Sequence, residues 1–193
     1  MRKLIVTNIV SLDGFITGPG GDVMAMPMDH AFDESNVEHM RTATTILLGA
    51  TSYRGFVGFW PSALEMPGIT EASAEIARLW PAMEKVTVSD SLTEDETGPW
   101  RETTTIVPRS AAHATVAALK EGDGGDILMF GSSVLWNDLL AAGLVDELHL
   151  MVGPVVVGDG TPAFRGGVTA TALRLTDVRR WDGSDNVLLS YAV

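Results

Sequence analysis

Cysteine is absent from the 193-residue chain, which excludes a disulfide framework, a thiolate metal site and a cysteine nucleophile. Cations are scarce, because 13 Lys and Arg face 25 Asp and Glu, a formal net charge of −12. This balance argues against nucleic acid or an anionic membrane surface as the main partner. No apolar run reaches the length of a transmembrane helix, and the N-terminal run is broken by Thr7 and Asn8 without a cleavage pattern. We therefore expect a cytoplasmic protein.

Familiar catalytic motifs are missing too. The chain has neither the Gly-x-Gly-x-x-Gly of Rossmann dehydrogenases nor the Gly-x-Ser-x-Gly of α/β-hydrolases. The four histidines, His30, His39, His113 and His149, are scattered along the sequence, and no metal site is predicted from them.

The hydrophobic pattern predicts a single α/β domain over residues 1–193. Its first three-quarters alternates strands and helices, whereas the last part contains strands alone, joined by turns rich in Gly and Asp. This order favours a mostly parallel sheet, with helices on both faces and antiparallel strands at the C-terminal end. Strands are predicted at 4–10, 45–48, 86–88, 103–107, 127–130, 145–152, 154–157, 172–181 and 187–193, and helices at 29–43, 51–59, 71–79, 110–120 and 132–140.

The stretch from Ile127 to Leu140 is the element around which the rest is expected to be arranged. Its apolar strand stops at Gly131, and Ser132 or Ser133 then precedes a helical pattern. Glycine lets a ligand approach the backbone, and a helix start offers unpaired N–H groups to a phosphate.

Three other strands end in turns of the same kind. The four joints are Ser11–Gly14, Gly49–Ser52, Ser89–Ser91 and Gly131–Ser133. Because parallel strands bring their C-terminal ends to one edge of the sheet, the four together predict a site of nucleotide size.

Asp33 falls on the same predicted helix face as the apolar Val37 and Met40. Its carboxylate is either a partner of the helix dipole in the first turn or an acid held against a pocket.

These motifs, in this order, resemble the dihydrofolate-reductase-like superfamily, in particular the group named for the C-terminal reductase domain of riboflavin-biosynthesis deaminase–reductases. The matching segments are Ser11-Leu12-Asp13-Gly14, Leu47-Leu48-Gly49 with Tyr53, Val88-Ser89, Gly125-Asp126-Ile127 with Gly131-Ser132, Leu144 to Leu148, and Pro154 to Gly160. The resemblance implies a three-layer αβα fold and a reductase that passes hydride from NADPH or NADH to a small pyrimidine- or pterin-like substrate.

The resemblance also implies residue roles. The cofactor would be held by Gly49, Ala50, Thr51, Ser52, Ser89, Asp90, Ser91, Gly131, Ser132, Ser133, Val134 and Leu135. The substrate would be held by Asn8, Asp13, Asp33 and Tyr53, of which Asp13 and Asp33 are the candidate catalytic residues.

Three departures from the family pattern bear on the ligands. Ala50 and Asp90 stand where relatives commonly have arginine, so the preference for NADPH over NADH should be small or reversed. Arg54 and Arg109 are the alternative cations. Phe15 replaces a lysine that is thought to face a phosphorylated substrate, which disfavours a ribose-phosphate substrate here.

Two functional classes stay open, a reductase and a non-catalytic nucleotide- or flavin-binding module on the same fold. A homodimer formed partly through the C-terminal strands is also expected, because Val187, Leu188 and Leu189 are too apolar for an exposed edge.

Overall fold

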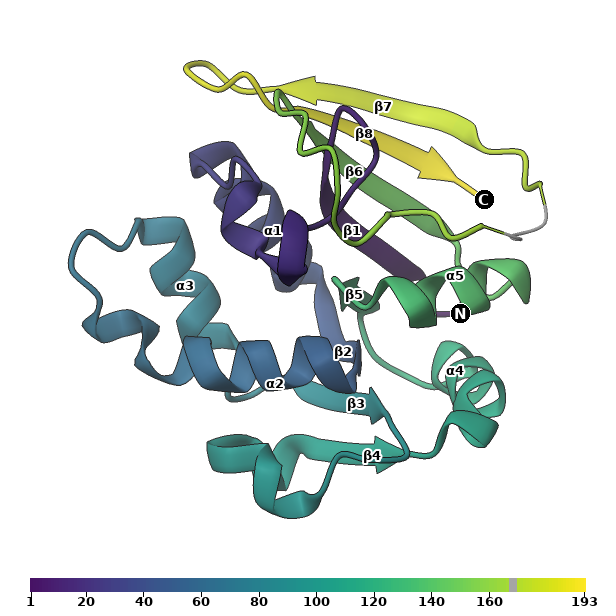
Figure 1. The fold of residues 1–193 in the computed structure, drawn as a ribbon. Helices are drawn as coiled ribbons and strands as arrows, with labels where there is room; N and C mark the ends of the chain where they lie inside the picture. The colour runs from purple at the N-terminus through teal and green to yellow at the C-terminus, as the bar shows by residue number, and fades with distance from the viewer. Residues whose placement is uncertain (167–169) are drawn as a thin grey trace.

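One mixed sheet of eight strands organises the computed structural model, which describes residues 1–166 and 170–193 (Figure 1). The strands are β1 (Leu4–Ser11), β2 (Ala43–Gly49), β3 (Glu84–Val88), β4 (Thr104–Val107), β5 (Asp126–Phe130), β6 (Glu147–Gly153), β7 (Arg174–Arg180) and β8 (Val187–Ala192). Their spatial order is β4-β3-β2-β5-β1-β6-β8-β7. Neighbours from β4 to β6 run parallel, whereas β8 is antiparallel to both β6 and β7.

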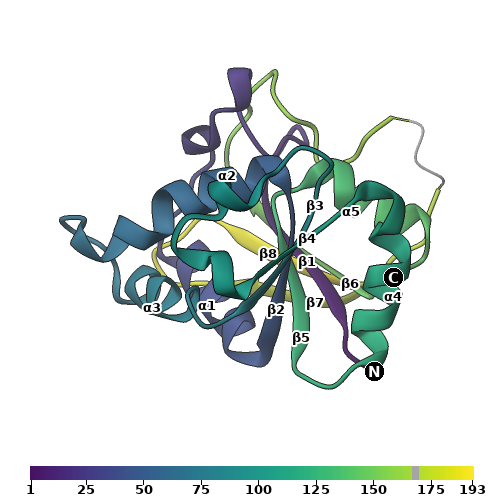
Figure 2. The same ribbon diagram turned by 90° about the horizontal axis from the view of Figure 1, so that it is seen from below.

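Helices cover both faces of the parallel part and complete three layers (Figure 2). The helices are α1 (His30–Thr42), α2 (Ala50–Phe59), α3 (Glu71–Leu79), α4 (Ala112–Glu121) and α5 (Ser133–Ala141). Short 3-10 helices lie at Pro19–Gly21, Val23–Ala25, Trp60–Glu65, Glu94–Thr103 and Arg109–Ala111. α1, α2 and α3 lie on one face, and α4 and α5 on the other. The fold is thus the predicted three-layer αβα arrangement.

Each face of the sheet has its own hydrophobic core. Val116 of α4 and Trp136 and Leu139 of α5 are fully buried against one face. Val37 of α1 and Ile76 of α3 pack on the other. All eight residues of β1, which separates these cores, are buried. Removing a large side chain of this kind from water stabilises the fold by about 1.5–3 kcal/mol.

The predicted elements are confirmed with one exception, and most of their ends shift by one to three residues. The strand expected at 154–157 is wrong. Pro154 has no N–H to donate to a ladder, and Val155 N–H turns back to the carbonyl of Gly153 at 2.8 Å.

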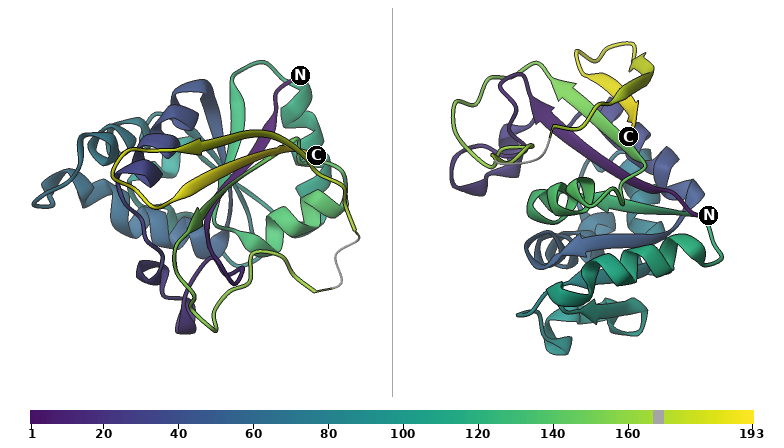
Figure 3. Two further views of the ribbon diagram at one scale, coloured as in Figure 1. Left: turned by 90° about the horizontal axis from the view of Figure 1, so that it is seen from above. Right: turned by 90° about the vertical axis from the view of Figure 1, so that its right-hand side faces the viewer.

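The segment that follows β6 instead covers the turn that follows β1. Leu12 N–H donates to the carbonyl of Val155 at 2.8 Å, and Phe15 forms a single antiparallel bridge with Pro162. A Cβ on Gly160 would lie 2.0 Å from the carbonyl oxygen of Thr17, so glycine is required at this crossing. Figure 3 shows the two loops together at one end of the molecule.

The position of β8 corrects the reasoning behind the expected dimer. β8, which carries Val187, Leu188 and Leu189, lies inside the sheet between β6 and β7. The edge is β7, where Leu175 and Val178 are 50% and 52% exposed. Across the described residues, none of the helices combines the length and apolar character needed to cross a membrane.

Candidate cofactor and substrate site

The β2–α2 and β5–α5 joints meet at the C-terminal edge of the sheet. Gly49 N–H donates to the hydroxyl of Ser132 at 3.0 Å, and Ser132 N–H donates to the hydroxyl of Ser52 at 2.9 Å. Ser132 has φ 53°, the left-handed region that a non-glycine residue seldom adopts. Such strain persists only where surrounding contacts hold it, which is common at ligand sites. The reciprocal bonds between the two joints supply those contacts.

Gly131 fits this junction because it lacks a side chain. Its φ is +57°, and a Cβ added there would lie 2.8 Å from the hydroxyl oxygen of Ser52. The side chain of Asn8 holds the Gly131 peptide from β1, accepting from its N–H at 2.8 Å and donating to its carbonyl at 3.5 Å. Asn8 therefore positions the turn, and both of its polar atoms are engaged there.

The starts of α2 and α5 have no capping side chain. Gly49 and Ser132 are the N-cap residues, and neither forms a side-chain bond to its own helix. Backbone N–H groups in a first turn lack helical partners and lie at the positive end of the dipole. Ala50, Thr51, Ser133, Val134 and Leu135 occupy these first turns; the N–H of Leu135 donates to the carbonyl of Ser132. Together the two helix starts suit an anionic group such as a pyrophosphate.

The Ser89–Ser91 turn lies at the end of β3, next to β2 in the sheet. The buried Ser89 hydroxyl accepts from the N–H groups of Ser91 and Leu92 at 3.0 and 2.9 Å. Asp90 accepts from the backbone N–H of Arg109 at 3.0 Å, and its carboxylate lies 3.7 Å from the Arg109 guanidinium. The carboxylate at this turn therefore has a cation beside it.

A second arginine reaches the same turn from α2. Arg54 donates to the Ser91 carbonyl at 3.4 Å and to the Glu96 carboxylate at 2.7 Å. The bond from Arg54, together with others, lowers the pKa of Glu96 to about 2. Arg54, one of the two alternative cations named from the sequence, follows Ala50 by one turn of α2.

Asp13 fastens the loop after β6 to the turn after β1. Its carboxylate accepts from the Ser11 hydroxyl at 2.6 Å and from the N–H groups of Gly158 and Val157 at 2.7 and 3.2 Å. The hydrogen bond from Ser11 is the main cause that holds the pKa of Asp13 below its usual value. An ionised Asp13 anchors the loop and cannot donate a proton at neutral pH.

Asp33 joins two helices. One carboxylate oxygen accepts from the hydroxyls of Thr70 and Ser73 at 2.9 and 2.7 Å, at the start of α3. Thr70 is itself the N-cap of α3. A role for Asp33 in substrate binding stays a prediction, and it would use the other carboxylate oxygen.

Tyr53 does not fit its predicted role. Its side chain is fully buried, and its hydroxyl lies 2.8 Å from the Thr104 hydroxyl and donates to the Thr97 carbonyl at 3.3 Å. Burial raises the pKa of the phenol. Tyr53 therefore anchors α2 to β4, and a substrate cannot touch it without a rearrangement of the core.

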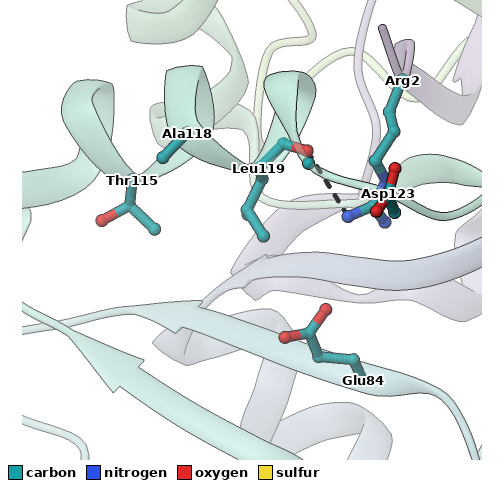
Figure 4. A pocket seen from close by; sticks show the side chains of 7 residues that line it. Arg2, Glu84, Thr115, Ala118, Leu119 and Asp123 are labelled. Atoms are coloured by element: carbon teal, nitrogen blue, oxygen red, sulfur yellow. Dashed lines mark hydrogen bonds between the residues drawn. The ribbon is translucent and has the colours of Figure 1, made fainter.

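A depression of about 490 Å³ lies at the opposite edge of the sheet, near the starts of β1 and β3 (Figure 4). It is lined by Arg2, Glu84, Thr115, Ala118, Leu119, Gly122 and Asp123, none of which is a predicted site residue. The Arg2 guanidinium already donates to the carbonyls of Gly125 and Leu119 at 2.7 and 3.5 Å. The Arg2 cation is therefore engaged within the fold. Among the described residues, no group of three or more His, Cys, Asp or Glu is arranged to hold a metal ion.

The sequence matches a known protein family. Residues 2–189 match the family described as the RibD C-terminal domain. The chain belongs to the RibD C-terminal domain family. The uncharacterised Bacillus subtilis protein YyaP is 29% identical over 163 residues, covering 84% of this chain and 80% of YyaP.

Solved structures share the fold at low sequence identity. A putative riboflavin biosynthesis protein from Shewanella sp. PV-4 superposes with a TM-score of 0.72 at 17% identity, covering 99% of this chain and 98% of that one. Dihydrofolate reductase from Enterococcus faecalis, solved as a complex with NADP(H), gives a TM-score of 0.60 at 14% identity, covering 98% and 95%. The RibD C-terminal domain of this chain thus has a reductase-type, dihydrofolate-reductase-like fold.

Proposed function

We propose that this RibD C-terminal domain protein is a nicotinamide-dependent reductase that transfers hydride to a small pyrimidine- or pterin-like substrate. The observation that carries the proposal is the junction of the two uncapped helix starts at Gly49–Ser52 and Gly131–Val134. Its donors suit a dinucleotide pyrophosphate, and the Ser89–Ser91 turn on the neighbouring strand suits the adenosine half. The complex of E. faecalis dihydrofolate reductase with NADP(H) supports a nicotinamide cofactor on this fold.

A bound nicotinamide would supply the hydride, so the protein has to bind, orient and shield the reactants. Asn8 and Ser52 fix the backbone of the pyrophosphate turn. Asp13 holds the loop after β6 over the turn after β1. With Phe15 in place of a lysine, the proposed substrate carries no ribose phosphate.

Cofactor preference is set in this proposal by the charges around the Ser89–Ser91 turn. Asp90 would repel the 2′-phosphate of NADPH, or accept from the free ribose hydroxyl of NADH. Arg109 is already engaged with Asp90, and Arg54 with Glu96. We therefore propose that NADPH has little or no advantage over NADH.

A non-catalytic nucleotide- or flavin-binding module is the second candidate. It is favoured by the engagement of Asp33 with α3 and by the burial of Tyr53, because both reduce the groups available to a substrate. Three measurements distinguish the reductase from the binding module. They are the absorbance of the purified protein, titrations with NADPH and NADH, and a turnover assay with pyrimidines and pterins. Oxidation of the nicotinamide that depends on substrate supports the reductase. Stoichiometric binding with no turnover of any compound supports the module.

A further inference from the structure

His39 of α1 and His149 of β6 are 110 residues apart in sequence but lie in direct contact. Their rings meet edge to face, with centroids 4.7 Å apart. His39 Nε2 and His149 Nδ1 are separated by 2.5 Å. The outer nitrogens are also engaged, His39 Nδ1 with the Ser35 carbonyl at 2.6 Å and His149 Nε2 with the Glu147 carboxylate at 2.9 Å.

The three contacts that link Ser35, His39, His149 and Glu147 need one hydrogen each. The Ser35 carbonyl and the Glu147 carboxylate only accept, so each needs an N–H from the ring beside it. The central contact needs one N–H between the two rings. Three protons are required, whereas two neutral imidazoles carry only two. The arrangement is complete when the pair carries one additional proton and hence one positive charge.

The proton belongs on the imidazoles rather than on Glu147. Burial raises the pKa of Glu147, but bonds from Lys3 and His149 outweigh it and bring that pKa below its ordinary value. Lys3 donates to the other Glu147 oxygen at 2.7 Å. Glu147 can thus accept from both sides as an anion.

Charged side chains also lie on the elements that carry the pair and on their neighbours, and Glu38 acts on His39 directly. On α1, Glu38 bonds to Arg179 of β7, and Arg41 bonds to Glu75 of α3. Asp126 at the start of β5 accepts from Thr42. Asp177 of β7 pairs with Ser190 of β8, which in turn pairs with His149. Most of these charges are matched locally, which leaves Glu147 as the counter-ion in direct contact.

We propose that His39 and His149 form a proton-dependent clasp between α1 and β6, closed when the two rings share one positive charge and opened by a further proton. The further proton would place two N–H groups against each other across the 2.5 Å contact. Removal of the shared proton would instead leave one of the three contacts without a hydrogen.

The direction of the acid response follows from burial. Burial, and then the charge of His149, lower the pKa of His39. The unfolded chain therefore binds this proton more tightly than the folded one. Against this further proton, stability from the clasp is present above the ordinary histidine value of about 6.5 and is lost as pH falls below it. On the alkaline side the clasp weakens again, because loss of the shared proton leaves one contact without a hydrogen. Because α1 also carries Asp33, acid would loosen the helix that bears this candidate residue.

The test uses the full chain and needs no ligand. Histidine ring nitrogen signals are followed by NMR from pH 8 to pH 5 in the wild-type protein, together with amide hydrogen exchange across α1. His39→Gln is the test variant, and His113→Gln is the matched control, because His113 contacts Asp138 at 2.7 Å on the surface. The wild-type titration reports on the clasp even where His39→Gln folds poorly.

We expect a shared N–H signal between the rings near neutral pH that disappears on acidification. Opening of α1 relative to the rest of the chain, measured as amide hydrogen exchange, should increase severalfold between pH 7 and pH 5. The increase should persist in His113→Gln and be absent in His39→Gln. Independent titration of the two rings, or the same acid response in His39→Gln as in the control, would overturn the proposal.

Discussion

Gly131→Ala perturbs the proposed pyrophosphate turn at one atom. The new Cβ would lie 2.8 Å from the Ser52 hydroxyl oxygen but 3.6 Å from Ser52 Cβ. The hydroxyl must therefore rotate away and lose its bond from Ser132 N–H, which costs about 0.5–1.5 kcal/mol. A left-handed alanine adds roughly 1–2 kcal/mol. We expect a loss of about 1.5–3.5 kcal/mol in the free energy of unfolding, measured by urea denaturation.

A matched control separates the two costs. Gly143 also has a positive φ, +68°, but nothing lies within 4 Å of the position of its Cβ. Gly143→Ala should therefore show the backbone cost alone. In a Ser52→Ala background, Gly131→Ala should fall to the same value, since the collision and the bond are already absent.

The same variant tests the site. Because the reciprocal bonds position both helix starts, Gly131→Ala should weaken NADPH and NADH binding by at least about tenfold, or 1.4 kcal/mol. Gly143→Ala should bind as wild type does. Equal unfolding costs for the two variants, together with unchanged cofactor affinity in Gly131→Ala, would refute this description of the junction.

Three further predictions address the core, the substrate and the assembly. Burial lowers the pKa of Lys85 from 10.5 to about 8. Lys85 then binds its proton more tightly in the unfolded chain than in the folded protein. The free energy of unfolding should therefore rise by roughly 3 kcal/mol as pH increases from about 8 to 10.5. Lys85→Met should lack this rise in urea denaturation, and a profile that matches wild type would contradict it. Asp33→Asn should weaken binding of a pyrimidine or pterin ligand by ~1.5–3 kcal/mol in calorimetry; a change in stability alone would show that Asp33 only joins α1 to α3. A homodimer should sediment at micromolar concentration, and Val178→Glu on exposed β7 should give monomers; wild-type protein that sediments only as a monomer would disprove it.

Local patterns were sufficient to predict most of the fold. The glycines and serines at the strand ends predicted the joints, and two of these joints, at Gly49 and Gly131, do meet. A strand was wrongly predicted after Gly153 because Val155 to Val157 are β-branched. The observed loop forms because Pro154 has no N–H to donate and because Asp13 accepts hydrogen bonds from the N–H groups of Val157 and Gly158.

Contacts between distant segments explain what the sequence could not show. The acceptor for Thr70 and Ser73 is Asp33, on another helix. The family motif predicts that Tyr53 binds the substrate. Its burial, however, depends on Thr104 and Trp100, which contact it from a later part of the chain. The contact between His39 and His149 depends on how α1 lies against β6. No spacing rule along the sequence contains that information.

Isothermal titration of the wild-type protein with NADPH and with NADH tests the central claim most directly. We predict that both bind at one site per chain, with affinities that differ by less than about tenfold, and that Ala50→Arg with Asp90→Arg shifts the preference toward NADPH. A preference of about a hundredfold for NADPH in the wild type would contradict the proposed charge arrangement and identify Arg54 or Arg109 as the phosphate ligand. If neither nucleotide binds, the proposed reductase itself is contradicted.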